Sequence, residues 1–142
     1  MEVVIVMNKE LKRKLISAAK KVRENAYVPY SNFPIGAAVL TVENKIFSGC
    51  NIENAAYGLT NCAERTAIYK AISEGYCKFK ALVVIADTEK PVTPCGSCRQ
   101  VLSEFGDDIE IIMVNINGDE EIKSSGELLP FSFGKEDIEV EN

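Results

Sequence analysis

Apolar residues recur at intervals of three and four positions along the first part of the chain, which is the spacing of one helical face. They are Leu11, Leu15, Ala18, Ala19 and Val22. Asn8 precedes them, and asparagine is a good helix-capping residue. The pattern predicts a helix from Asn8 to about Asn25. A loop follows over residues 26–34, where two prolines and a Ser-Asn pair interrupt the periodicity.

Shorter apolar or alternating runs further along the chain predict β-strands. Residues 36–42 and 45–50 flank Glu43-Asn44 and predict a hairpin. The continuous apolar runs 79–86 and 109–116 are typical of strands covered on both faces, and residues 120–123 are a candidate for a further short strand.

Two more helices are predicted between these strands. One covers residues 62–74 and ends at Gly75, and the other covers residues 96–105 and ends at Gly106. This order of elements predicts an α/β fold, a three-layer α/β/α sandwich around a mixed five-stranded sheet. Right-handed crossovers place the two helices on one face of the sheet and start both at the same sheet edge.

Length and charge limit the functions that this chain can have. Its 142 residues predict a single domain over residues 1–142. Sixteen basic and 21 acidic residues give a net charge of −5, which argues against nucleic acid as a partner. The apolar residues 1–7 are too short to span a bilayer and lack the basic start of a signal peptide. We interpret them as a loose extension of a cytoplasmic protein that does not contact membranes.

The chain contains five cysteines and no histidine, so a tight zinc site must be built mainly from thiolates. Two fragments carry thiols at a suitable spacing: Cys62-Ala63-Glu64-Arg65 and Pro94-Cys95-Gly96-Ser97-Cys98-Arg99-Gln100. In a cytosolic protein such thiols indicate metal binding or free cysteine rather than disulfides. Cys62, Cys95 and Cys98 would supply three ligands to Zn²⁺ and leave the fourth tetrahedral position for water, as in catalytic zinc sites.

Glu64 lies two residues after Cys62, close enough to exchange a proton with such a water without binding the metal. The plainer alternative is a glutamate in the first helical turn that only favours the helix dipole. Three thiolates make the site formally negative, and an arginine can offset that charge. Arg65 and Arg99 are the candidates, and the i, i+3 spacing from Cys62 favours Arg65.

These fragments resemble the small homotetrameric cytidine deaminases, which use zinc. The resemblance extends over nearly the whole chain from about Asn8. It includes Tyr30-Ser31-Asn32-Phe33-Pro34-Ile35-Gly36-Ala37-Ala38, Gly49-Cys50-Asn51-Ile52-Glu53-Asn54-Ala55 and Leu128-Leu129-Pro130-Phe131-Ser132-Phe133. It implies hydrolytic deamination of cytidine and 2′-deoxycytidine in pyrimidine salvage, one Zn²⁺ per subunit and a homotetramer.

The resemblance also implies a role for individual residues. Cys62, Cys95 and Cys98 would bind zinc, Glu64 would shuttle the proton and Arg65 would partly neutralise the thiolates. The substrate would be held by Phe33 against the pyrimidine, Asn51 and Glu53 at the sugar 3′-hydroxyl, the Ala63 backbone at the base edge, and the Cys95 amide at the hydroxyl added to C4. Phe133 would enter the pocket of a neighbouring subunit.

Several alternatives stay open from the residues alone. Phe33 can be an ordinary core residue, and Asn51 and Glu53 can belong to a solvated loop. The two remaining cysteines, Cys50 and Cys77, are interpreted as small buried thiols. At the level of function, the alternatives are a deaminase of a nucleoside-like antibiotic, a nucleic-acid deaminase, and a structural or redox module in which Cys50 completes a four-cysteine zinc site.

Overall fold

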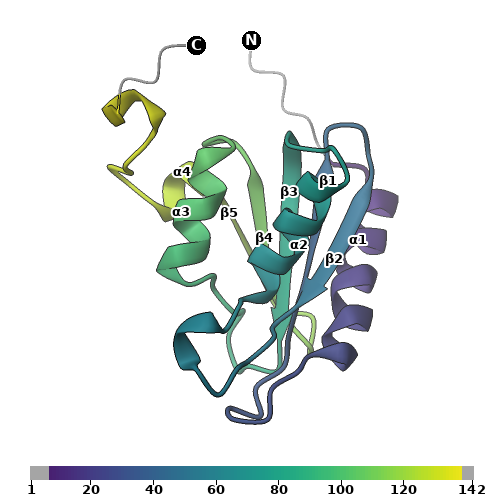
Figure 1. The fold of residues 1–142 in the computed structure, drawn as a ribbon. Helices are drawn as coiled ribbons and strands as arrows, with labels where there is room; N and C mark the ends of the chain where they lie inside the picture. Colours follow the sequence, from purple (N-terminus) through teal and green to yellow (C-terminus); the bar gives the residue numbers. More distant parts are fainter. Residues whose placement is uncertain (1–6, 139–142) are drawn as a thin grey trace.

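The computed structural model describes residues 7–138, which form a five-stranded sheet with helices on both faces (Figure 1). The strands are β1 (Ile35–Thr41), β2 (Ile46–Cys50), β3 (Phe79–Ala86), β4 (Glu110–Asn115) and β5 (Glu120–Ser124). The α-helices are α1 (Lys9–Val22), α2 (Ala63–Ser73), α3 (Gly96–Glu104) and α4 (Ser125–Leu128). Three 3₁₀-helices complete the elements: η1 (Arg23–Asn25), η2 (Tyr57–Leu59) and η3 (Lys135–Ile138).

The sheet is mixed, with the strand order β2-β1-β3-β4-β5. The hairpin β1–β2 is antiparallel, β1 is also antiparallel to β3, β3 and β4 run parallel, and β5 returns antiparallel to β4. A parallel pair needs a crossover connection, and α3 provides it between β3 and β4. The predicted fold class, an α/β/α sandwich around a mixed five-stranded sheet, is confirmed.

Two buried apolar clusters lie on opposite faces of the sheet. One joins the inner sides of α2 and α3 to the sheet, with Ile68 and Leu102 among its members. The other joins α1 to the opposite face through Leu15 and Ala19. In Figure 1, α2 and α3 lie side by side in front of the sheet and α1 lies behind it. Both α2 and α3 begin at the same edge of the sheet, as the crossover argument predicts.

Local capping interactions set the first and last residues of the helices. The Asn8 side chain caps α1 by accepting a hydrogen bond from the backbone N–H of Glu10 at 2.7 Å. Gly75 follows α2 with φ +96°, a left-handed backbone conformation that glycine adopts without strain. The first helix is shorter than predicted, since residues 23–25 tighten into η1.

The structure corrects the prediction for Cys77 and describes only part of the predicted N-terminal extension. Cys77 is exposed rather than buried, because it lies in the turn between α2 and β3, whereas Cys50 is buried at the end of β2. Residues 1–6 of the predicted extension lie outside the described residues, while Met7 is half-buried and packs against the α1 cluster. Among residues 7–138, no helix is long and apolar enough to cross a membrane.

Candidate metal centre and active site

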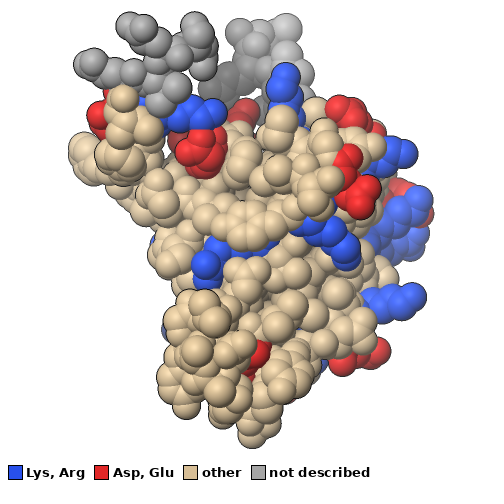
Figure 2. Space-filling view, in the orientation of Figure 1, with Lys and Arg blue, Asp and Glu red and all other residues tan. Residues whose placement is uncertain are grey.

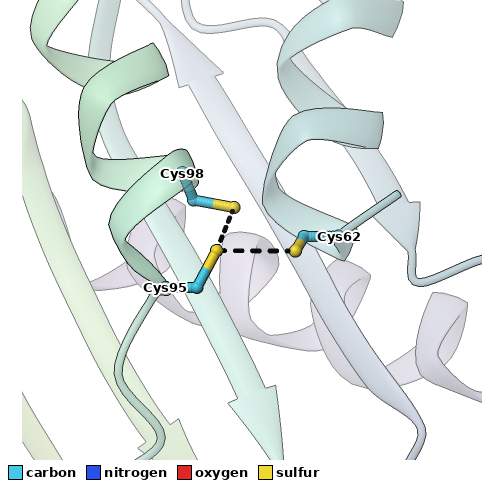
Figure 3. Close-up of side chains that lie close together, drawn as sticks. All are labelled: Cys62, Cys95 and Cys98. Atoms are coloured by element: carbon cyan, nitrogen blue, oxygen red, sulfur yellow. Dashed lines mark hydrogen bonds between the residues drawn. The ribbon is translucent and has the colours of Figure 1, made fainter. Parts of the chain in front are cut away.

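Three cysteines converge between the N-termini of α2 and α3 (Figure 3). Cys62 is the N-cap residue of α2, Cys95 is the N-cap residue of α3, and Cys98 lies in the first turn of α3. The Sγ atoms of Cys62 and Cys95 are 3.6 Å apart, and those of Cys95 and Cys98 are 3.5 Å apart. All three sulfurs lie within 4.8 Å of one another, and all three cysteines are free.

These separations fit a tetrahedral zinc ion. A Zn–S bond of about 2.3 Å and a tetrahedral angle place two sulfur ligands about 3.8 Å apart. A disulfide would instead need an S–S distance of about 2.05 Å. Cys50 is not a member of the group, so the group holds three sulfurs rather than the four of a closed structural site.

Arg65 makes the direct contact with the thiols. Its Nη2 donates a hydrogen bond to the Sγ of Cys62 at 3.2 Å, one turn back along α2. Arg99 points elsewhere: its Nε donates to the Pro94 carbonyl at 2.8 Å, and its Nη1 donates to the Leu128 carbonyl at 3.1 Å. The positive charge beside the sulfurs therefore comes from Arg65, while Arg99 ties the Pro94 turn to the end of α4.

The metal-free thiols do not ionise together. Hydrogen bonding by Cys98 and then by Arg65 lowers the pKa of Cys62 to about 5. The same contact with Cys62, together with burial, raises the pKa of the Cys98 thiol above its usual value. One thiolate thus forms beside a neighbour that keeps its proton. A divalent cation would reverse this, because its charge favours the thiolate form of every ligand.

Glu64 is buried beside the three sulfurs, with 3% of its surface exposed. Its Oε1 is one of two buried side-chain atoms in residues 7–138 that lack a hydrogen-bond partner, and the other is Nε of Arg65. Burial raises the pKa of the Glu64 carboxyl to about 7, and the neighbouring charge of Cys62 adds to the rise. A carboxyl that titrates near neutral pH can both accept and donate a proton there.

Backbone donors border the same space. Ala63 is the first residue of α2, and the first N–H groups of a helix have no partner within the helix. Ala63 is fully buried, so a group placed against its backbone would be shielded from water. Cys95 is the N-cap residue of α3, so its amide lies directly before the first residue of that helix.

The predicted substrate-binding residues belong to two loops that are joined by hydrogen bonds. The Oδ1 of Asn51 accepts from the Ile35 N–H at 2.9 Å, and its Nδ2 donates to the Phe33 carbonyl at 2.9 Å. The Oε1 of Glu53 accepts from the backbone N–H groups of Tyr30 and Ser31, at 3.0 and 3.1 Å. These loops are therefore ordered by side-chain contacts, and Phe33, at 38% exposure, is not a core residue.

A short pairing connects this pair of loops to the metal ligands. Ile52, which lies between Asn51 and Glu53, exchanges two backbone hydrogen bonds with Asn61, at 3.0 and 2.9 Å. Asn61 immediately precedes Cys62. The structure thus places the Asn51–Glu53 segment alongside the residue that leads into the metal site.

Phe133 lies apart from these residues on the C-terminal segment. The Nε2 of Gln100 on α3 donates to its backbone carbonyl at 2.9 Å, and the Phe133 ring is 60% exposed. The side chain of Phe133 is therefore largely uncovered in the single chain.

Sequence patterns missed the contacts of two residues, Ser31 and Gln100. Ser31 bonds to Glu53 and Gln100 bonds to Phe133, 22 and 33 residues away along the chain. A Ser-Asn pair in the sequence indicates only a loop, and a glutamine within a helix does not indicate which residue its side chain contacts. No local pattern identifies contacts at such separations.

Comparison with known proteins identifies the family. Residues 9–114 match the family model described as the cytidine and deoxycytidylate deaminase zinc-binding region. A cytidine deaminase of Sporosarcina psychrophila is 56% identical over 126 residues, which are 88% of this chain and 93% of that protein. The crystal structure of cytidine deaminase from Burkholderia pseudomallei superposes with a TM-score of 0.83 at 51% identity, covering 85% of this chain and 98% of the other.

A more distant relative bears on the antibiotic alternative. A blasticidin-S deaminase of Bacillus cereus is 30% identical over 107 residues, 70% of this chain and 76% of that protein. The similarity to cytidine deaminases is stronger and more extensive. Together with the zinc-binding family model, the three converging thiols make Zn²⁺ the cofactor and the protein a zinc-dependent hydrolytic enzyme. The chain belongs to the cytidine and deoxycytidylate deaminase family.

Proposed function

We propose that this enzyme hydrolyses cytidine and 2′-deoxycytidine to uridine and 2′-deoxyuridine and releases ammonia. The observation that carries the proposal is the buried Glu64 carboxyl, whose Oε1 has no partner, beside three free thiols at zinc-binding separations. A buried carboxyl with an open acceptor is a costly arrangement unless a bound group uses it.

Each residue of the site has a task in this reaction. Zn²⁺ held by Cys62, Cys95 and Cys98 supplies a Lewis acid that activates water near neutral pH. Glu64 takes a proton from the attacking water and delivers it to N3 of the pyrimidine while C4 is attacked. Glu64 then takes the proton of the hydroxyl formed at C4 and delivers it to the departing nitrogen; as the C4–N bond breaks, the C4 oxygen becomes the carbonyl of the uracil ring and the nitrogen leaves as ammonia. The Ala63 backbone orients the base edge, and the Cys95 amide faces the hydroxyl formed at C4.

The pyrimidine would pack against Phe33, and the sugar end of the substrate would lie against Asn51 and Glu53. After the hydrogen bonds described above, Asn51 retains one amide hydrogen of its Nδ2 as a donor. The Oε2 of Glu53 retains one acceptor position beside its bond from the Ser31 hydroxyl. One spare donor and one spare acceptor match a sugar hydroxyl, which accepts one bond and donates another. We assign this pair to the 3′-hydroxyl.

We further propose that four chains assemble into a homotetramer. Among the most exposed large apolar residues in residues 7–138 are Tyr57 (75%) and Leu59 (71%) on the 51–61 connection, and Phe131 (108%) and Phe133 (60%) on the tail. The lower part of Figure 2 is largely uncharged, and in Figure 1 the 51–61 connection lies there. Light scattering should give about four times the chain mass of 15.6 kDa, and Leu59→Glu should lower it.

The surface and the thiols support the remaining proposals. On the face shown in Figure 2, Lys and Arg side chains lie among Asp and Glu side chains rather than in the continuous basic stripe that a nucleic-acid substrate favours. All five cysteines are free, which suits a reducing compartment such as the cytoplasm. There the reaction would return cytosine nucleosides to the uracil nucleoside pool in pyrimidine salvage.

A spectrophotometric assay of the purified protein with cytidine, run beside metal analysis, tests the proposal. We expect uridine and ammonia in equal amounts and one Zn²⁺ per chain. Blasticidin S should be a poorer substrate, because it lacks a plain ribose for Asn51 and Glu53 to bind. A zinc-loaded, folded protein that deaminates blasticidin S but not cytidine would contradict the proposal.

A further inference from the structure

Ser31 lies at the centre of the hydrogen bonds that hold the sugar-binding loop. Its hydroxyl donates to Oε2 of Glu53, and its backbone N–H donates to Oε1 of the same carboxylate at 3.1 Å. The same hydroxyl accepts from the backbone N–H of Phe33 at 3.0 Å. One side chain thus connects the carboxylate proposed to bind the sugar to the aromatic residue proposed to pack against the base.

The backbone of the loop is held in a defined conformation at the two residues that follow Ser31. Asn32, the next residue, has φ +55° in the left-handed region. The amide of Asn51 fixes the other side of Phe33, because its Nδ2 donates to the Phe33 carbonyl at 2.9 Å. Both backbone polar groups of Phe33 are therefore held by side chains before any substrate binds.

The contacts on Glu53 show what Ser31 determines. Oε1 is satisfied by two backbone N–H groups, those of Tyr30 and Ser31. Oε2 is held by one hydroxyl only, so the direction of its free lone pair depends on that bond. The bond from Ser31 is also the largest influence that lowers the pKa of Glu53, which favours the ionised form of this carboxylate.

We propose that Ser31 is a positioning residue for sugar recognition, whose hydroxyl aims Oε2 of Glu53 at the 3′-hydroxyl of the nucleoside. Ser31 itself does not touch the reacting atoms. The inference rests on the sugar contact proposed above for Glu53. It predicts that loss of the Ser31 hydroxyl weakens recognition of one particular substrate group rather than catalysis in general.

The test compares two substrates on the same enzyme preparation. Ser31→Ala should lower kcat/KM for cytidine about tenfold, the loss expected when one hydrogen bond to a charged group no longer orients it. With 3′-deoxycytidine, which lacks the hydroxyl in question, the same variant should stay within about twofold of the wild type. Ser31→Thr keeps a hydroxyl at an exposed position and should restore most of the cytidine activity.

Ser73→Ala is the matched control, since its hydroxyl donates to the Lys70 carbonyl in α2, outside the sugar-binding loop. It should leave both substrates unaffected. An equal loss on the two substrates in Ser31→Ala would overturn the inference and leave Ser31 a purely structural role. Unchanged cytidine turnover in that variant would also overturn it. A wild-type enzyme that deaminates both nucleosides equally well would overturn the Glu53 sugar contact and this inference, while leaving deamination itself intact.

Discussion

The Nη2 of Arg65 donates a hydrogen bond to Sγ of Cys62 across 3.2 Å, one helical turn along α2. This contact places the arginine charge on a metal ligand instead of on a carboxylate. Three thiolates bound to Zn²⁺ leave a net negative site, which reduces the electron-withdrawing power of the metal. We propose that Arg65 draws charge back from one sulfur and thereby preserves the acidity that hydrolysis requires.

Replacing Arg65 should therefore slow the reaction without emptying the site. We expect Arg65→Gln to lower kcat by about 10- to 100-fold, the range found when a residue that supports a metal ligand is lost. Arg65→Lys keeps the charge but not the fork geometry and should recover part of the rate. The measurements are steady-state kinetics with cytidine and zinc content by elemental analysis.

Arg99→Gln is the control for Arg65, because Arg99 bonds to the carbonyls of Pro94 and Leu128 and to no sulfur. It should lower stability more than it changes the chemical step. If Arg65→Gln kept full kcat, the charge of Arg65 would be irrelevant to the metal.

Zinc stoichiometry should separate the three clustered cysteines from the other two. Cys98→Ser removes a fully buried ligand and should reduce bound zinc well below one per chain. Cys50→Ser and Cys77→Ser should keep one zinc, since neither residue belongs to the sulfur group. Loss of zinc in Cys50→Ser, with a folded protein, would instead favour a four-cysteine structural site.

Glu64 should make the stability of the metal-free protein depend on pH. Burial raises the pKa of its carboxyl from 4.5 to about 7, so the folded state binds this proton more tightly than the unfolded chain. The tighter binding of this proton in the folded state therefore contributes fully to the free energy of unfolding below about pH 4.5. The contribution is lost as the pH rises through about 7. Glutamine cannot ionise and removes this dependence.

Unfolding of the metal-free proteins by denaturant, under reducing conditions, measures the effect. Between about pH 4 and about pH 8, the stability of Glu64→Gln relative to wild type should rise by roughly 3 kcal/mol. A relative stability that stays constant over this range would mean that Glu64 titrates as an exposed glutamate does.

Gly49 should tolerate no side chain, because α2 packs directly on β2 there. A Cβ at this position would lie 2.5 Å from the backbone nitrogen of Ala67 and 2.8 Å from Cβ of Thr66. Gly49→Ala should destabilise the protein by about 1–3 kcal/mol, a typical cost of overpacking. Gly58→Ala meets no atom within 4 Å and should change stability by less than about 0.5 kcal/mol in a thermal or denaturant unfolding experiment.

The fold was largely predictable because the ends of its helices and strands carry local sequence signals. Asn8 and Gly75 mark helix ends by capping chemistry, and the apolar run 79–86 matches β3 residue for residue. The meeting of Cys62 with Cys95 and Cys98 followed from topology, since helices on one face of the sheet begin at one edge. Spacing, capping and periodicity act over a few residues and set the element boundaries, while the meeting of the cysteines needed only the order of those elements in addition.

The remaining features depend on contacts between distant parts of the chain. Sequence spacing favoured Arg65 over Arg99 but could not show that Arg99 bonds to Leu128, 29 residues away. The same holds for the Asn51 amide, which joins two residues of a loop 16 and 18 positions earlier. Cys77 was expected to be buried because small thiols usually are, and its exposure depends on how the turn after α2 faces solvent.

The most direct test is the turnover of cytidine by zinc-loaded Glu64→Gln. Glutamine keeps the size of the buried side chain but cannot carry the proton from water to the pyrimidine. Our account predicts that this variant binds one Zn²⁺ per chain and that its kcat falls by at least about a hundredfold. Near-normal turnover in the zinc-loaded variant would show that another group moves the proton, which would contradict the role assigned to Glu64.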